Sequence, residues 1–151
     1  MGSQGERIHG SAPLSGRKTL TFIAALSYGS IVAPCVFDHG MDKVTFSTWV
    51  KKSLAPNLNR KSIVVLDNLS SHTCTMVKEV FRELKIHYIY LPPYSPDMNP
   101  IEYFFSKLKA CMRIAQAREI EAIMECLKKV MEDTPPEECQ NYFRHCGYVS
   151  T

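Results

Sequence analysis

The chain has 151 residues, a length that suits one globular domain. Its 45% hydrophobic and 22% charged residues exclude disordered and fibrous classes, and a net charge of +3 says little about nucleic acid. No apolar run approaches the ~20 residues of a membrane span, and the N-terminus is too polar for a secretory signal. The six cysteines form no CxxC pair. We therefore expect a soluble intracellular protein with reduced thiols and no membrane partner.

The first half of the chain predicts a flexible start followed by a hairpin and a helix. Residues 1–18 are rich in Gly, Ser and basic side chains without periodicity, which is typical of a flexible N-terminal segment. Residues 19–27 and 31–37 are strand-like, and Pro34 suits an edge strand or a bulge. The apolar spacing in residues 45–54 predicts an amphipathic helix.

The second half alternates between strands and helices. Residues 62–66 form a wholly apolar run of the kind that is covered on both faces of a sheet. The next elements are a helix that Ser71 could cap, a strand at 86–91, two helices divided near Gln116, and a short helix stopped by Gly147. This order predicts an α/β domain with a mixed, partly antiparallel sheet and flanking helices.

Two acidic residues lie at positions where catalytic sites often form. Asp67 follows the apolar strand directly, and sites in open α/β sheets form at such strand ends. Glu102 falls in the first turn of the helix after Asn99-Pro100. Carboxylates in such places can ligate a divalent metal. Structural interpretations stay open: Asn99 and Glu102 have capping-box spacing, Asp67 and Asn68 could form an ordinary turn, and His72 could simply pack at a helix start.

Longer motifs favour the chemical interpretation. The segments VVLDNLSSH and YLPPYSPDMNPIEYFFSKLK closely resemble the DDE transposase domain of mariner-like elements, in the bacterial insertion-sequence branch. GERIHGSAP, FIAALSYGSIVAP and PEECQNYFRHCGY resemble it as well, so the resemblance covers nearly the whole chain. The second and third family acids fall on Asp67 and Glu102, and the 34 residues between them are the spacing of this family.

The resemblance implies a ribonuclease-H-like (integrase-like) fold and a DNA-cutting function. Asp67 and Glu102 would be the catalytic, metal-ligating residues, with Mg²⁺ or Mn²⁺ as two ions in the complete site. Asn68 and His72 would lie around them. The DNA partners would be transposon ends and target, and the protein would work in the bacterial cytoplasm at the nucleoid.

The family's first aspartate has no counterpart here. The acid that precedes the predicted hairpin is Glu6, and it lies in the segment expected to be flexible. We therefore expect residues 19–151 to form a partial DDE catalytic domain that lacks its first strand. An upstream polypeptide, a second reading frame or full-length transposase could supply the missing part.

The charge pattern adds a candidate DNA contact. Residues 102–118 contain four basic side chains and one acid. Lys109 and Arg113 would share a helical stripe with Glu102 and could face DNA phosphates, or simply form a solvated surface. Three functions stay open: a transposase fragment inactive alone, half of a two-chain active transposase, and a non-catalytic fragment that binds DNA or inhibits transposase. A host ribonuclease-H-like nuclease is disfavoured.

Overall fold

The protein is organised around one five-stranded mixed sheet. The computed structural model describes residues 3–14 and 18–148, with side chains from residue 20 onward. The strand order is β3-β2-β1-β4-β5. Strand β2 pairs antiparallel with β1 and β3, whereas β4 pairs parallel with β1 and β5. The strands are β1 (Ser3–Leu14), β2 (Lys18–Leu26), β3 (Ile31–Phe37), β4 (Ile63–Leu66) and β5 (His87–Tyr90).

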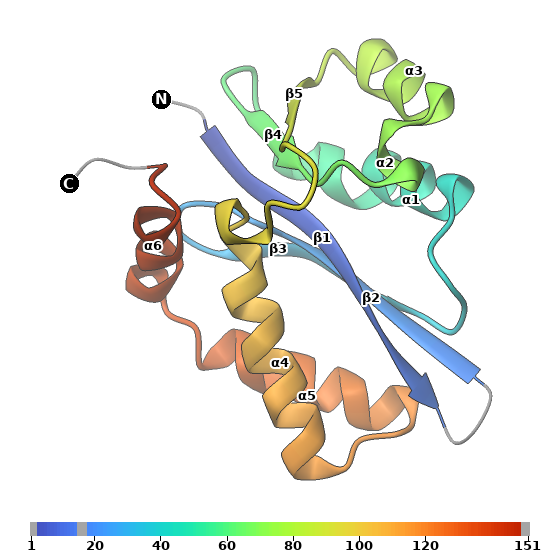
Figure 1. Ribbon diagram of the computed structural model, residues 1–151, viewed down its shortest axis with the longest axis vertical. Coiled ribbons are helices and arrows are strands. Elements are labelled where there is room, and N and C mark those ends of the chain that lie inside the picture. The colour runs from blue at the N-terminus through green and yellow to red at the C-terminus, as the bar shows by residue number, and fades with distance from the viewer. Residues whose placement is uncertain (1–2, 15–17, 149–151) are drawn as a thin grey trace.

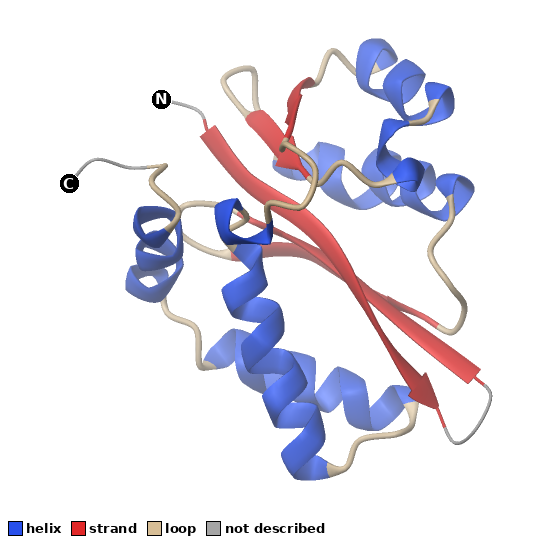
Figure 2. Cartoon of the chain, in the orientation of Figure 1, coloured by secondary structure: helices blue, strands red, loops and turns tan. Residues whose placement is uncertain are grey.

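Helices cover both faces of the sheet, as Figures 1 and 2 show. The helices are α1 (Lys43–Trp49), α2 (Ser70–Thr73), α3 (Thr75–Glu83), α4 (Ile101–Ala115), α5 (Ile120–Glu132) and α6 (Pro136–His145). Among the described residues, no helix is long and apolar enough to cross a membrane. The predicted α/β class with a mixed sheet is confirmed.

Strand β2 is apolar almost throughout because both of its faces are buried. Leu20, Phe22, Ala24 and Leu26 alternate toward one core, which α4, α5 and α6 complete. Ile23 and Ala25 point toward a second core, which they share with α1, α3 and β4. A strand buried on both faces needs apolar side chains at every position, which removes the alternation typical of half-buried strands.

The N-terminal segment differs from the prediction. Residues 3–14 form strand β1, which pairs with β2 from Arg7 to Leu14 and with β4 near Glu6. The expectation of a flexible 1–18 segment is therefore wrong for residues 3–14, and the central position of the sheet is not empty. The physical reason is that a strand between two others is held by backbone hydrogen bonds, which need no apolar periodicity in the sequence. Residues 1–2 and 15–17 lie outside the described residues.

The edge strand β3 has the irregularity that Pro34 predicts. Ala33 adopts a φ of 56°, and the β2–β3 register shifts between Ile23 and Ala25. The freed carbonyl of Ala33 accepts a hydrogen bond of 2.8 Å from the Trp49 indole nitrogen. This contact joins the bulge to α1, whose own start is capped by Asp42.

The helices after the sheet are fixed to one another by a polar contact. Lys107 on α4 donates to Glu138 on α6 at 2.9 Å and to the Asp133 carbonyl at 2.6 Å, just after α5. Tyr142 also donates its hydroxyl to Glu138. The predicted break near Gln116 is confirmed, because α4 ends at a left-handed Gln116. The helix predicted to begin at Ser71 is instead divided into α2 and α3 at Cys74.

Candidate active site

Asp67 is positioned by the strand that precedes it. Val64, Val65 and Leu66 of β4 are buried, and the chain leaves the sheet at Asp67, whose side chain is half-buried. The Leu66 carbonyl accepts the Leu91 amide at 2.8 Å, which ties the ends of β4 and β5 together. Asp67 thus stands at the carboxyl edge of two parallel strands.

Asn99 holds the Asp67 carboxylate. The Asn99 side-chain amide donates a hydrogen bond of 2.7 Å to Asp67 Oδ1. Asn99 is fully buried, and its own Oδ1 accepts the Ile101 amide at 3.3 Å, at the start of α4. One side chain therefore joins the end of β4 to the beginning of α4. The sequence-based interpretation of Asn99 as a helix cap was incomplete, because the amide end reaches 32 residues back along the chain.

His72 lies beneath the turn that follows Asp67. Its side chain is fully buried, and its Nδ1 lies 3.2 Å from the Asp67 carbonyl oxygen. The imidazole stacks on Phe46 of α1 at a ring distance of 4.3 Å. The His72 carbonyl accepts the Tyr90 hydroxyl at 2.6 Å, and burial raises the Tyr90 pKa to about 12, so this hydroxyl keeps its proton at neutral pH. His72 thereby anchors the backbone of Asp67 to the core.

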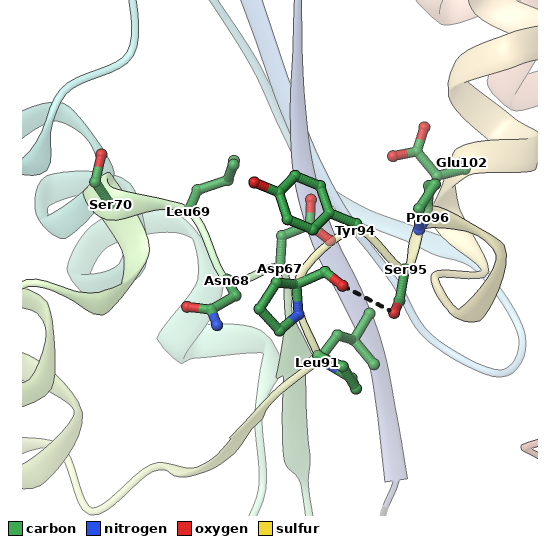
Figure 3. A pocket seen from close by; sticks show the side chains of 11 residues that line it. Asp67, Asn68, Leu69, Ser70, Leu91, Tyr94, Ser95, Pro96 and Glu102 are labelled. Carbon is green, nitrogen blue, oxygen red and sulfur yellow. Dashed lines mark hydrogen bonds between the residues drawn. The ribbon is translucent and has the colours of Figure 1, made fainter.

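Glu102 and Asp67 line the same cavity. This cavity has a volume of about 420 Å³, and Figure 3 shows Asp67 at the end of β4 and Glu102 in the first turn of α4. Asn68 lines it too and is exposed. The structure therefore brings together the two acids that the sequence singled out. The remaining lining residues are Leu69, Ser70, Leu91, Pro92, Pro93, Tyr94, Ser95 and Pro96.

The segment between β5 and α4 forms one wall of this cavity. It turns at Pro93 and Tyr94 and then makes a 3-10 turn over Pro96–Met98. The Ser95 hydroxyl bonds the Pro93 carbonyl at 3.3 Å, as Figure 3 marks, and the Tyr148 hydroxyl bonds the Met98 carbonyl at 2.7 Å. Asp97 is exposed in this turn and does not line the cavity.

The two predicted phosphate contacts lie farther along α4. Lys109 and Arg113 are both exposed. At 1.5 Å per residue they lie ~10 Å and ~16 Å from Glu102 along the helix axis.

Two carboxylates line the cavity, those of Asp67 and Glu102. In the part of the chain that the structure describes, no three His, Cys, Asp or Glu side chains gather closely enough to hold a metal ion. The carboxylates of Asp67 and Glu102 nevertheless offer the oxygen atoms that Mg²⁺ and Mn²⁺ prefer. The residues present fit part of a divalent-metal site.

Comparisons with known proteins place the chain in one family. The family model of the DDE superfamily endonucleases matches residues 2–137. The Tc1 transposase of Caenorhabditis elegans is 25% identical over 70% of this chain, and the Tcb2 transposase of Caenorhabditis briggsae is 24% identical over 74%. These matches span only 42% and 46% of the two relatives.

Solved structures agree on the fold. The Mos1 transposase catalytic domain, in a structure with raltegravir and Mg, superposes with a TM-score of 0.79 at 14% identity, covering 95% of this chain and 77% of that one. The Mos1 strand transfer complex matches with a TM-score of 0.72 at 16% identity, covering 95% of this chain and 50% of that one. The ribonuclease-H-like fold predicted from the sequence is thus confirmed. With the family model matching most of its length, the chain belongs to the DDE superfamily endonucleases and is similar to the transposases of Tc1/mariner elements.

Proposed function

We propose that the chain is catalytic-domain material of a DNA transposase, in which Asp67 and Glu102 ligate the divalent metal for DNA strand cleavage and transfer. The observation behind this proposal is that one cavity is lined by both acids, which come from the end of β4 and the start of α4. Its setting in a DDE endonuclease family supports DNA as the substrate. The assignment to a bacterial insertion-sequence branch, acting at the nucleoid, stays a prediction.

Mg²⁺ or Mn²⁺ is the proposed cofactor. Mos1 catalytic-domain structures that superpose on this chain were solved with Mg and with Mn. When bound, such ions activate the attacking oxygen and stabilise the leaving oxygen of a phosphodiester. A two-ion site usually needs a third, bridging acid. Residues 1–37 contain no aspartate, so this acid would come from Glu6 or from another polypeptide segment.

The other residues position the acids and the DNA. Asn99 fixes the orientation of the Asp67 carboxylate, and His72 fixes its backbone. Lys109 and Arg113 would contact phosphates without reading bases. Asn68, exposed at the cavity, would contact water or DNA near the acids. The Mos1 structures include paired-end and strand transfer complexes, which supports transposon ends and target DNA as the partners.

A second candidate is DNA binding without cleavage. The observation that favours it is the lack of a three-acid cluster among the described side chains. In this form the chain would occupy DNA or associate with an intact transposase and inhibit it.

DNA binding and cleavage by the purified chain test the proposal. We expect the wild-type chain to bind a fluorescent DNA duplex more tightly in Mg²⁺ than in EDTA. Asp67→Asn and Glu102→Gln should each remove this gain in affinity, because each substitution keeps the side-chain volume and removes a metal-ligating charge. We expect no cleavage by the chain alone. Metal-independent binding that neither substitution changes would contradict the proposed site, and cleavage abolished by Glu102→Gln would contradict the second candidate.

A further inference from the structure

Tyr94 is exposed beside the two acids. Its relative exposure is 100%, the highest among the exposed large hydrophobic residues of the described chain. It nevertheless lines the same cavity as Asp67 and Glu102. In Figure 3 its ring projects across the cavity, between Leu69 on one side and Pro96 and Glu102 on the other. Because its side chain is fully exposed, Tyr94 contributes no packing to either hydrophobic core.

The backbone holds this ring in an unusual conformation. Tyr94 has a φ of 59°, the left-handed region that favours glycine. It follows Pro92-Pro93 and precedes Ser95-Pro96, and the fixed φ angles of the prolines stiffen the segment on both sides. A bulky residue kept in a strained conformation, with its ring fully exposed, indicates a contact with something outside the fold.

We infer that Tyr94 stacks on an unpaired nucleobase of the DNA strand whose phosphate meets Asp67 and Glu102. This inference rests on the proposed function and adds a substrate-positioning residue to it. A base inside a duplex offers only its edges, whereas an unpaired base offers its whole face to an aromatic ring. The neighbouring rim is suitably apolar, because Leu69 is 39% exposed and Pro92 and Pro93 are exposed.

Stacking at this position would fix the strand relative to the acids. A ring that holds the base next to the reacting phosphate limits sliding along the backbone, which phosphate contacts alone permit. The ring therefore favours DNA that is unpaired beside the reacting phosphate over continuous duplex. It reads the presence of a free base rather than its identity, since every base has a π-face.

Fluorescence of 2-aminopurine tests the inference directly. The probes are a nicked duplex with a single unpaired 2-aminopurine next to the nick, and the same duplex with that base paired. Ca²⁺ is the metal, since carboxylates ligate it as well. We expect the wild-type chain and Tyr94→Phe to quench the fluorescence of the unpaired probe. Tyr94→Ala should lose this quenching and bind the unpaired probe about tenfold more weakly, while its affinity for the paired probe changes little.

Tyr94→Gly separates binding from folding. Glycine relieves the positive φ, so the midpoint of thermal unfolding should not fall, while the quenching should be lost as in Tyr94→Ala. Ile114→Ala is the matched control, because Ile114 is 85% exposed near the far end of α4 and should bind both probes like wild type. Unchanged quenching and affinity in Tyr94→Ala would overturn the inference alone. Failure of the wild-type chain to bind either probe would overturn the proposed function and the inference with it.

Discussion

Asn99 joins the Asp67 carboxylate to the start of α4, the helix that carries Glu102. It is fully buried between β4 and α4, and its amide and carbonyl ends bond different elements. A hydrogen bond to the carboxylate at 2.7 Å restricts the rotation of Asp67. Groups that orient metal ligands in this way typically change metal affinity when they are removed.

We expect Asn99→Leu to weaken Mn²⁺ binding by about tenfold, because the Asp67 carboxylate loses its fixed orientation. The measurement is a Mn²⁺ titration followed by electron paramagnetic resonance. The same substitution should have almost no further effect in an Asp67→Asn background, since Asn99 acts through Asp67. Equal losses in both backgrounds would show that Asn99 acts only through general stability.

For single residues, the sequence predicted which side chains line the cavity better than it predicted their contacts. Asp67 and Glu102 could be predicted, because one ends an apolar strand and both lie in long motifs. The Asn99–Asp67 bond could not, because periodicity and capping rules describe neighbours within a few residues and this bond spans 32. The exposure of Tyr94 was equally hidden, since no pattern distinguishes a buried from an exposed aromatic residue in a proline-rich turn.

At the scale of elements, strand β1 shows the limit of hydrophobic patterning. The segments 19–27, 31–37 and 62–66 were predicted as strands and form β2, β3 and β4 with small shifts of their ends. The segment SQGERIHGSAPL gives no such pattern and still forms the central strand. Pairing of its backbone with β2 and β4 decides its conformation, and that information lies in the partners rather than in the segment.

The contact that joins α4 to α6 leads to a prediction about pH. Burial tends to raise the Glu138 pKa, but hydrogen bonds from Tyr142 and Lys107 outweigh this and hold it below its ordinary value of 4.5. A carboxyl with a lowered folded-state pKa stabilises the fold above pH 4.5, and this contribution is lost as the pH falls through the folded-state value.

Glu138→Gln should therefore lower the midpoint of thermal unfolding by about 2–4 °C at neutral pH. The difference from wild type should shrink as the pH falls below 4.5 and through the lower folded-state pKa, because the folded wild-type carboxyl becomes protonated in that range. Thermal scans by circular dichroism across this range provide the measurement. Glu137→Gln, which removes an exposed carboxylate of the same turn, should have a smaller effect at neutral pH. A difference that grows toward acid pH would show that Glu138 is not stabilised by these hydrogen bonds.

At the scale of the whole molecule, Lys109 and Arg113 form an exposed basic stripe on α4, the helix whose first turn lines the cavity. Lys109→Ala and Arg113→Ala should each weaken DNA binding about equally for any sequence. Each should also reduce the slope of log affinity against log salt by ~0.9, because a phosphate contact releases counterions but reads no base.

The control for this prediction is Lys128→Ala, which removes an exposed charge from α5. It should leave the slope unchanged, since acidic residues surround Lys128 in the sequence. Fluorescence anisotropy over a series of salt concentrations gives all three slopes. A reduced slope for Lys128→Ala together with a normal slope for Arg113→Ala would place DNA on the other helix.

The central claim is that Asp67 and Glu102 ligate one metal ion together, and a Mn²⁺ titration followed by electron paramagnetic resonance tests it most directly. We predict saturable binding by the wild-type chain, and affinities at least about tenfold weaker for Asp67→Asn and for Glu102→Gln. Asp97→Asn removes an exposed acid of the same loop and should bind like wild type. Normal Mn²⁺ affinity in Glu102→Gln, together with lost affinity in Asp97→Asn, would contradict the account.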